Sequence, residues 1–325
     1  MQAPINSKKD QILNKLKELK IDATLLVLST FVLLQIFRVI HLLLPSKTLE
    51  SIFVIPFQLL IFLIPTYLFA RFKDQRSPMN YIMKLRMKLP RLYQLPLIAA
   101  AIVTISAGCL LISLAFGGAS STSEGFTLYN TFVSRSNFGF FESIYLIVAY
   151  AAVPAVCEEL IFRAILCREF ERYNVVCAIV ASSLFFALLH FDLSLFPVYL
   201  FAGIFLALCM YATGSVIVPM IIHFFYNVIG LFGQPYLNAF YEITGGSTGL
   251  FAFIVFIIGM LAAALFCTFA SKSYKRRAEF SRIPDHPLFP KSDALVHIVS
   301  EILLTPWSIA AVCFYIVVII IYSLI

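Results

Sequence analysis

Three short stretches of the chain place ionisable and amide side chains at helical spacing within apolar sequence. These residues are, in chain order, Glu158, Glu159, Arg163, His190, His223 and Asn227. Glu159 and Arg163 are four positions apart, so on a helix they share a face and can form an ion pair. Glu158 points about 100° away on a helix of 3.6 residues per turn. Its carboxylate is therefore left free to act as a general base.

These residue types suit hydrolysis of a peptide bond. The reaction needs a base for the attacking water and donors for the developing oxyanion. A carboxylate with a histidine can supply the base, and an asparagine amide with a second histidine can supply the donors. Glu158 and His190 are equally far along the chain from Asn174, where the sequence predicts a turn. The two side chains should therefore reach the same depth on an antiparallel pair of helices.

A zinc site is the alternative that these residues leave open. Glu158, His190 and His223 could bind zinc, with a fourth position open to water. Two features argue against it: the sequence has no HExxH helix, and a metal at Glu159 would leave the buried charge of Arg163 without a partner. A mechanism without metal or cofactor is favoured over zinc.

The other polar residues in the apolar segments are expected to have structural roles. They are Arg38, His41, Gln58, Glu142 and Glu301. Asp192 follows His190 closely and has two interpretations. It either orients the imidazole or caps a helix end, and the second is slightly favoured.

The composition indicates that most of the surface faces lipid. Of 325 residues, 61% are hydrophobic and 13% are charged, whereas soluble domains carry about a quarter charged residues. The net charge of +7 comes from a few basic segments between apolar runs, which is typical of membrane proteins and gives no sign of nucleic-acid binding. The seven cysteines form no CxxC pair, so neither a disulfide framework nor a zinc finger is expected.

Nine apolar segments approach the length of about 20 residues that a membrane-spanning helix needs. They are 23–44, 50–70, 93–117, 142–171, 175–191, 196–213, 215–232, 247–270 and 299–324. The runs are continuous rather than alternating, so we expect helices and not a barrel. The predicted fold is all-α: a polytopic membrane bundle of about eight to nine transmembrane helices. Residues 1–21 form a basic segment, and 22–325 form one membrane domain with its catalytic core at 142–232.

The basic residues also predict the orientation of the chain. With nine spans, the basic segments 1–21, 71–92 and 271–297 fall on the same side as the end of the fourth helix. The positive-inside rule makes this side, with the N-terminus, cytoplasmic. The sequence shows no eukaryotic targeting signal, so a bacterial inner membrane is the expected location.

The three stretches resemble a known family. Glu158-Glu159-x-x-x-Arg163, Phe186-x-x-x-His190 and His223-x-x-x-Asn227 are similar, in order and spacing, to motifs of the CAAX protease and bacteriocin-processing family. This family is also called the type II CAAX-prenyl endopeptidase or Abi family, and the resemblance covers about residues 142–232. It implies that the first glutamate activates water together with the motif histidine. It further implies that the second glutamate and the arginine support the site, and that the HxxxN motif stabilises the oxyanion.

The resemblance implies an intramembrane endopeptidase. Its expected partners are the lipid bilayer and a peptide, lipidated or membrane-protein substrate. Two other classes compete with this interpretation. A proton-coupled transporter would use the same buried glutamates and histidines, and a non-catalytic scaffold or immunity protein would bind a peptide without cutting it. Nothing in the sequence indicates an oligomeric state.

Overall fold

A computed structural model describes residues 23–42, 47–73, 78–83, 85–116, 139–171, 174–280 and 303–324. All regular elements among these residues are helices, which confirms the predicted all-α fold. The basic segment 1–21 lies outside the described residues, as do parts of the predicted segments 23–44 and 299–324.

The long helices follow the apolar runs of the sequence. They are α2 (Ala23–Leu42), α3 (Lys47–Lys73), α5 (Leu95–Phe116), α12 (Phe196–Thr213), α13 (Ile217–Phe232), α15 (Thr248–Phe280) and α17 (Pro306–Leu324). The shorter elements are α4 (Pro78–Met83), the 3-10 turn η1 (Leu92–Gln94), α11 (Val175–Leu189) and α14 (Gln234–Ile243). One further long helix is built from successive pieces: α8 (Phe140–Ile147), η2 (Val148–Ala152), α9 (Val153–Glu159), η3 (Leu160–Leu166) and α10 (Cys167–Glu171).

Seven helical segments of the described chain are long and apolar enough to cross a membrane. An eighth candidate is the pair α13 and α14, which is bent by 68° at Gly233. The predicted segment 175–191 forms α11, which has 15 residues and is shorter than a full span. The protein is therefore an integral membrane protein with a polytopic helix bundle.

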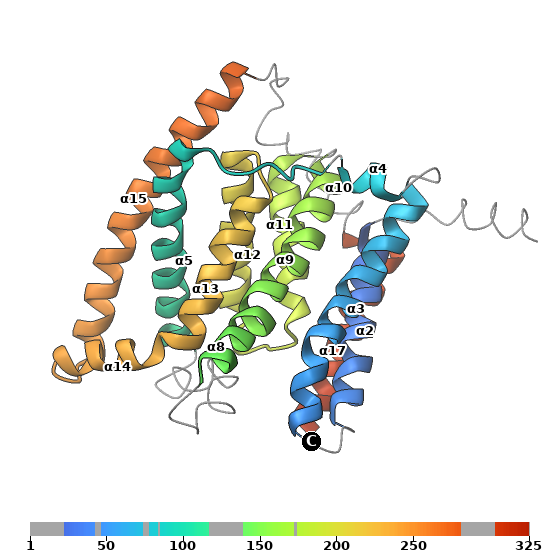
Figure 1. Cartoon of the computed structure of the whole chain (residues 1–325), viewed down its shortest axis with the longest axis horizontal. Coiled ribbons are helices and arrows are strands. Elements are labelled where there is room, and N and C mark those ends of the chain that lie inside the picture. Colours follow the sequence, from blue (N-terminus) through green and yellow to red (C-terminus); the bar gives the residue numbers. More distant parts are fainter. Residues whose placement is uncertain are drawn as a thin grey trace, which may run out of the picture.

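The helices form three neighbouring groups (Figure 1). Helices α2, α3 and α17 lie together on one side, α5 and α15 on the other, and α9 to α13 between them. Buried residues of one hydrophobic core come from all three groups, including Phe31 of α2, Ile161 of η3 and Ile105 of α5. The motif-bearing helices are thus enclosed on both sides by helices that carry no motif.

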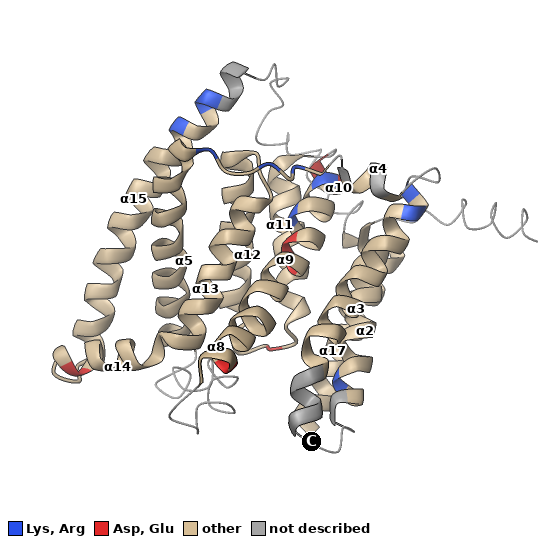
Figure 2. Ribbon diagram, viewed as in Figure 1, with Lys and Arg blue, Asp and Glu red and all other residues tan. Residues whose placement is uncertain are grey.

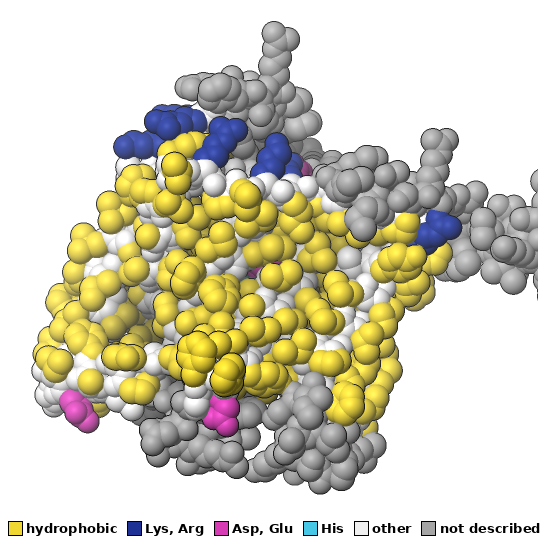
Figure 3. Space-filling view, in the orientation of Figure 1, with side chains coloured by type: hydrophobic (Ala, Val, Ile, Leu, Met, Phe, Trp, Pro, Cys, Tyr) yellow, Lys and Arg dark blue, Asp and Glu magenta, His cyan; other side chains and the backbone are white. Residues whose placement is uncertain are grey.

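Many of the charged residues lie near the two ends of the helices, and basic residues gather at one end (Figure 2). Figure 2 shows basic residues at one end of the molecule, in the loop before α5 and at the ends of α3, α10 and α15. Acidic residues near the start of α8 and the end of α14 lie at the opposite end. Between the ends, the face seen in Figure 3 is covered with hydrophobic side chains. This common basic end is the one that the positive-inside rule predicts to be cytoplasmic.

Candidate active site

Glu158 and Glu159 end a short α-helical stretch that lies between two π-helical segments. The segment η2 precedes α9, and η3 begins directly after Glu159. In a π-helix each carbonyl bonds the N–H five residues further on, and π segments are frequent at functional sites. The continuous apolar sequence of 142–171 does not reveal either segment.

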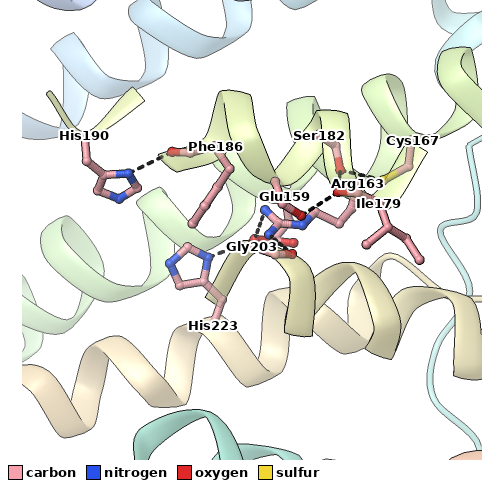
Figure 4. A network of polar contacts seen from close by, with 10 residues as sticks. Glu159, Arg163, Cys167, Ile179, Ser182, Phe186, His190, Gly203 and His223 are labelled. Carbon is pink, nitrogen blue, oxygen red and sulfur yellow. Dashed lines mark hydrogen bonds and ion pairs between the residues drawn. The ribbon is translucent and has the colours of Figure 1, made fainter. Parts of the chain in front are cut away.

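Glu159 is fully buried, and one of its oxygens accepts two hydrogen bonds (Figure 4). Arg163 Nη1 lies 2.9 Å and His223 Nδ1 lies 3.0 Å from Glu159 Oε1. The ion pair predicted from the four-residue spacing is therefore present. Arg163 Nη2 also donates to the Gly203 carbonyl at 2.9 Å, and the guanidinium carbon lies 4.3 Å from the centre of the Phe186 ring. These added contacts offset part of the cost of burying both charges.

Gly203 allows the close approach that this network requires. A Cβ atom at Gly203 would lie 3.0 Å from both the Cα and the Cβ of Ser183, so any larger residue there would push α12 away from α11 by a few tenths of an ångström. The short separation brings the Gly203 carbonyl within reach of Arg163. The motif spacing gives no sign of this residue, because its role depends on how two helices pack.

Glu158 differs from its neighbour because it has no hydrogen bond among the described residues. Its side chain is buried, and its Oε2 atom is shielded from solvent without a partner. A buried polar group without a partner destabilises the fold, so water or a bound reactant is expected to satisfy it. Glu159 is therefore held in a network through Oε1, whereas Glu158 is available to a substrate or a water molecule.

His190 follows the last residue of α11 and is held by backbone and ring contacts. Its Nδ1 lies 2.9 Å from the Phe186 carbonyl oxygen. Because a carbonyl can only accept, Nδ1 carries a proton, and Nε2 of the neutral ring holds the lone pair. The imidazole stacks on Tyr199 of α12, with ring centroids 3.7 Å apart. No direct hydrogen bond joins His190 to Glu158 in the described part of the chain, so joint action requires a water between them.

Phe191 anchors the turn that follows His190. Its φ of 51° lies in the left-handed region that bulky residues rarely adopt. The buried ring contacts Phe31 of α2 and Tyr315 of α17, with centroids 5.3 Å and 5.4 Å away. Helices outside the three motifs thus help to fix the position of His190.

His223 and Asn227 lie four positions apart on α13 and therefore share a face. With Nδ1 bound to Glu159, His223 has only Nε2 left for a ligand. Nε2 can donate to an oxyanion only while the ring carries both protons. The half-buried Asn227 amide makes no hydrogen bond among the described residues. An amide N–H can donate whatever the pH, because it does not have to gain a proton first. Of the two, Asn227 is thus the simpler candidate for an oxyanion donor.

One of the two interpretations of the sequence was that Asp192 orients His190. The described contacts do not support it. Asp192 Oδ1 accepts a hydrogen bond from the backbone N–H of Leu195 at 3.0 Å and closes the turn before α12. The carbonyl of Phe186 takes the orienting role instead. A carbonyl four residues earlier is available on any helix, so the spacing of the motif does not single it out.

The residues expected to be structural are placed as follows. Arg38 Nη1 donates to the Tyr322 hydroxyl at 3.3 Å. Glu142 accepts the backbone N–H of Gly139 at the start of α8. The Gln58 side-chain oxygen is shielded from solvent and has no hydrogen-bond partner in the described part of the chain. Two side chains lie outside what the structure describes, those of His41 and Glu301.

The arrangement does not fit the zinc alternative. Among the described residues, no three His, Cys, Asp or Glu side chains are close enough to hold one metal ion. Glu158, His190 and His223 therefore do not form a ligand set here, and His223 Nδ1 is already bound to Glu159.

Comparison with known proteins gives one match. Residues 140–229 match the family model described as Type II CAAX prenyl endopeptidase Rce1-like. All six candidate residues fall within this segment, which runs from α8 into α13. No match was found among curated proteins or among solved structures.

Proposed function

Because residues 140–229 form an Rce1-like domain of the type II CAAX prenyl endopeptidase family, we propose that the protein is an intramembrane endopeptidase. Glu158 is its general base, and the observation that carries this role is the contrast between the two glutamates. Glu158 is buried and makes no hydrogen bond to any residue that the structure describes, whereas Glu159 is held by Arg163 and His223.

The proposed reaction begins with a water molecule between Glu158 and His190. Glu158 takes one proton from this water as the oxygen attacks the peptide carbonyl, and Nε2 of His190 accepts a hydrogen bond from it. The carbonyl oxygen becomes an oxyanion, which the Asn227 amide stabilises, joined by His223 when that ring is protonated. Glu158 then returns its proton to the leaving nitrogen, so the products are a carboxylic acid and an amine.

The buried pair of Glu159 and Arg163 is proposed to position the other groups. Glu159 holds His223 through Nδ1, which aims Nε2 at the reaction space. Arg163 ties the pair to α12 through the Gly203 carbonyl. Side chains held in this way need no reorganisation during the reaction.

The proposed substrate is a peptide, a lipidated peptide or a segment of a membrane protein. The candidate residues lie on helices within an apolar bundle, which supports a substrate that enters from the lipid bilayer. We also propose a bacterial inner membrane with the basic end of the bundle in the cytoplasm.

The test is cleavage of a peptide library by the full-length protein in detergent. Glu158→Gln and His190→Ala should each lower turnover by about 10²- to 10⁴-fold, the usual contribution of general acid–base groups. Glu142→Gln is the matched control, because it changes a carboxylate of the same long helix outside the site, and it should cleave normally. A zinc chelator should leave cleavage unchanged.

The same experiment separates the competing classes. A scaffold or immunity protein would bind peptide equally with Glu158 or Gln at this position and would release no fragments. A zinc enzyme would lose cleavage with the chelator. Normal cleavage by Glu158→Gln would contradict the role of this residue.

A further inference from the structure

A cavity of about 170 Å³ lies at the basic end of the helices, and Arg163 is the one candidate site residue in its lining. It is lined by Arg86, Arg163, Ala164, Arg168 and Val216. The arginines come from different elements: Arg86 from the loop before α5, Arg163 from η3 and Arg168 from α10. At about 30 Å³ for each water, the cavity has room for about five water-sized groups.

Two arginine donors at this cavity are unused. Among the described residues, Arg163 Nε and Arg168 Nη1 have no hydrogen-bond partner, and both atoms are shielded from solvent. Arg163 is 1% exposed, so bulk water does not satisfy its Nε group. A buried charged donor without a partner destabilises the fold, so a bound acceptor is expected next to each of these donors. Because two such arginine donors line one cavity, we expect a hydrogen-bond acceptor to bind between them.

The charges around the cavity do not balance among the described residues. Arg163 is paired with Glu159, and Arg86 is paired with Glu171 at 2.8 Å. Arg168 has no carboxylate partner in the described part of the chain, and its guanidinium carbon lies 5.0 Å from the Tyr81 ring centre. The adjacent carboxylate of Glu169 is bound to Lys73 and to the Tyr81 hydroxyl. One positive charge is therefore left over, which suits a singly charged anion.

The shape of the donor set favours phosphate over carboxylate. One guanidinium fork satisfies a planar carboxylate, whereas a tetrahedral phosphate accepts donors from several directions. The segment from Arg86 to the start of η1 also has the strongly exposed Leu89 and Leu92 beside basic residues. Apolar side chains next to basic ones at the cytoplasmic end of helices are typical of contact with lipid headgroups.

We propose that this cavity is a phosphate-binding site, filled by the headgroup of an anionic phospholipid or by a free phosphate ion. The bound group accepts from Arg163 Nε and Arg168 Nη1. Because Arg163 also holds Glu159, the occupant is linked through one side chain to the candidate active site. The site does not depend on the proposed peptidase activity, and binding alone tests it.

The experiment measures thermal unfolding of the full-length protein. In neutral detergent, sodium phosphate is compared with sodium chloride and sodium acetate at equal ionic strength. In vesicles, phosphatidylcholine alone is compared with an equal mixture of phosphatidylcholine and phosphatidylglycerol. Phosphate or the anionic vesicles should raise the unfolding temperature saturably, by about 3 °C or more. A shift with inorganic phosphate indicates a free ion, and a shift with anionic vesicles alone indicates a headgroup.

Arg168→Gln should abolish the shift. Arg276→Gln is the matched control and should keep it, because Arg276 lies at the same basic end but packs on Tyr93 outside the cavity. If Arg168→Gln does not fold, Arg168→Lys tests the site, since it keeps the charge but loses the fork and should weaken the shift at least threefold. An equal shift in the Arg168 variants, an equal shift with acetate, or no shift for wild type with phosphate or anionic vesicles would overturn the proposal.

Discussion

His190 and Tyr199 lie face to face, with ring centroids 3.7 Å apart and an interplanar angle of 16°. The stack holds the imidazole from α12 while the Phe186 carbonyl holds it from α11. Tyr199→Leu should therefore lower turnover by about 10- to 100-fold through misplacement of His190, with little effect on KM. Tyr199→Phe keeps the ring and should retain most of the activity. Peptide cleavage rates for the two variants check this.

The control for the stack is Tyr236→Leu, since Tyr236 is an exposed tyrosine on α14. It should cleave like wild type. If Tyr199→Phe were as impaired as Tyr199→Leu, the hydroxyl and not the stacked ring would be the feature that matters.

At position 191, a glycine variant should be more stable than an alanine variant, which is the reverse of the order in a helix. At its φ of 51°, alanine adds strain that glycine avoids. Phe191→Gly should therefore be more stable than Phe191→Ala by about 1 kcal/mol. Both variants lose the contacts to Phe31 and Tyr315, and both should cleave more slowly because His190 loses its anchor. Thermal unfolding and cleavage rates provide the two measurements.

The control is a phenylalanine in an ordinary helix, where the alanine variant should be the more stable of the two. Phe253 on α15 is exposed, and there alanine should be more stable than glycine by about 1 kcal/mol. The same order at both positions would mean that Phe191 does not hold a left-handed conformation in the membrane.

Glu159→Gln should strongly destabilise the fold. The change leaves the buried Arg163 guanidinium without its carboxylate, and breaking a buried pair costs about 3–5 kcal/mol. It also removes the charged acceptor of His223 Nδ1. The measurement is denaturant unfolding in detergent micelles.

The comparison for Glu159 is Lys73→Gln. Lys73 pairs with Glu169 at 2.7 Å, but its side chain is 27% exposed. Exposed pairs contribute about 0–1 kcal/mol. A loss for Glu159→Gln no larger than that for Lys73→Gln would argue against the buried network.

Gly203→Ala should destabilise the contact between α11 and α12. Its Cβ would meet the backbone of Ser183 at 3.0 Å, and overpacking of this kind costs about 1–3 kcal/mol. Any shift of α12 would also lengthen the bond from Arg163 to the Gly203 carbonyl, so cleavage should fall as well. Gly249→Ala on α15 serves as control, because a Cβ there meets nothing within 4 Å. Equal stability of the two variants would show that the helices can separate without cost.

Most helix positions could be predicted, because lipid requires long apolar runs. The predicted segment 196–213 coincides with α12, and 215–232 nearly coincides with α13 (Ile217–Phe232). The helix α14 was missed, because its ten residues mix polar and apolar types and are too short to span a membrane.

The candidate site was predictable only where it follows from local spacing. The four-residue interval between Glu159 and Arg163 was enough to predict their ion pair. Tyr199 and Gly203 lie on α12, which carries no motif, and their importance arises only when α12 packs on α11. The left-handed turn at Phe191 depends likewise on aromatic rings from α2 and α17, far away in the sequence.

The π segment η3 has a consequence for insertions and deletions. A π turn is equivalent to an α turn that has accommodated one extra residue. Deleting Ile161 would let the helix relax to regular α geometry, with little strain on α10. The same deletion would shorten the interval between Glu159 and the arginine from four residues to three, an interval that still places two side chains on one face of an α-helix. The helix and its ion pair should thus both tolerate the loss of one residue at this point.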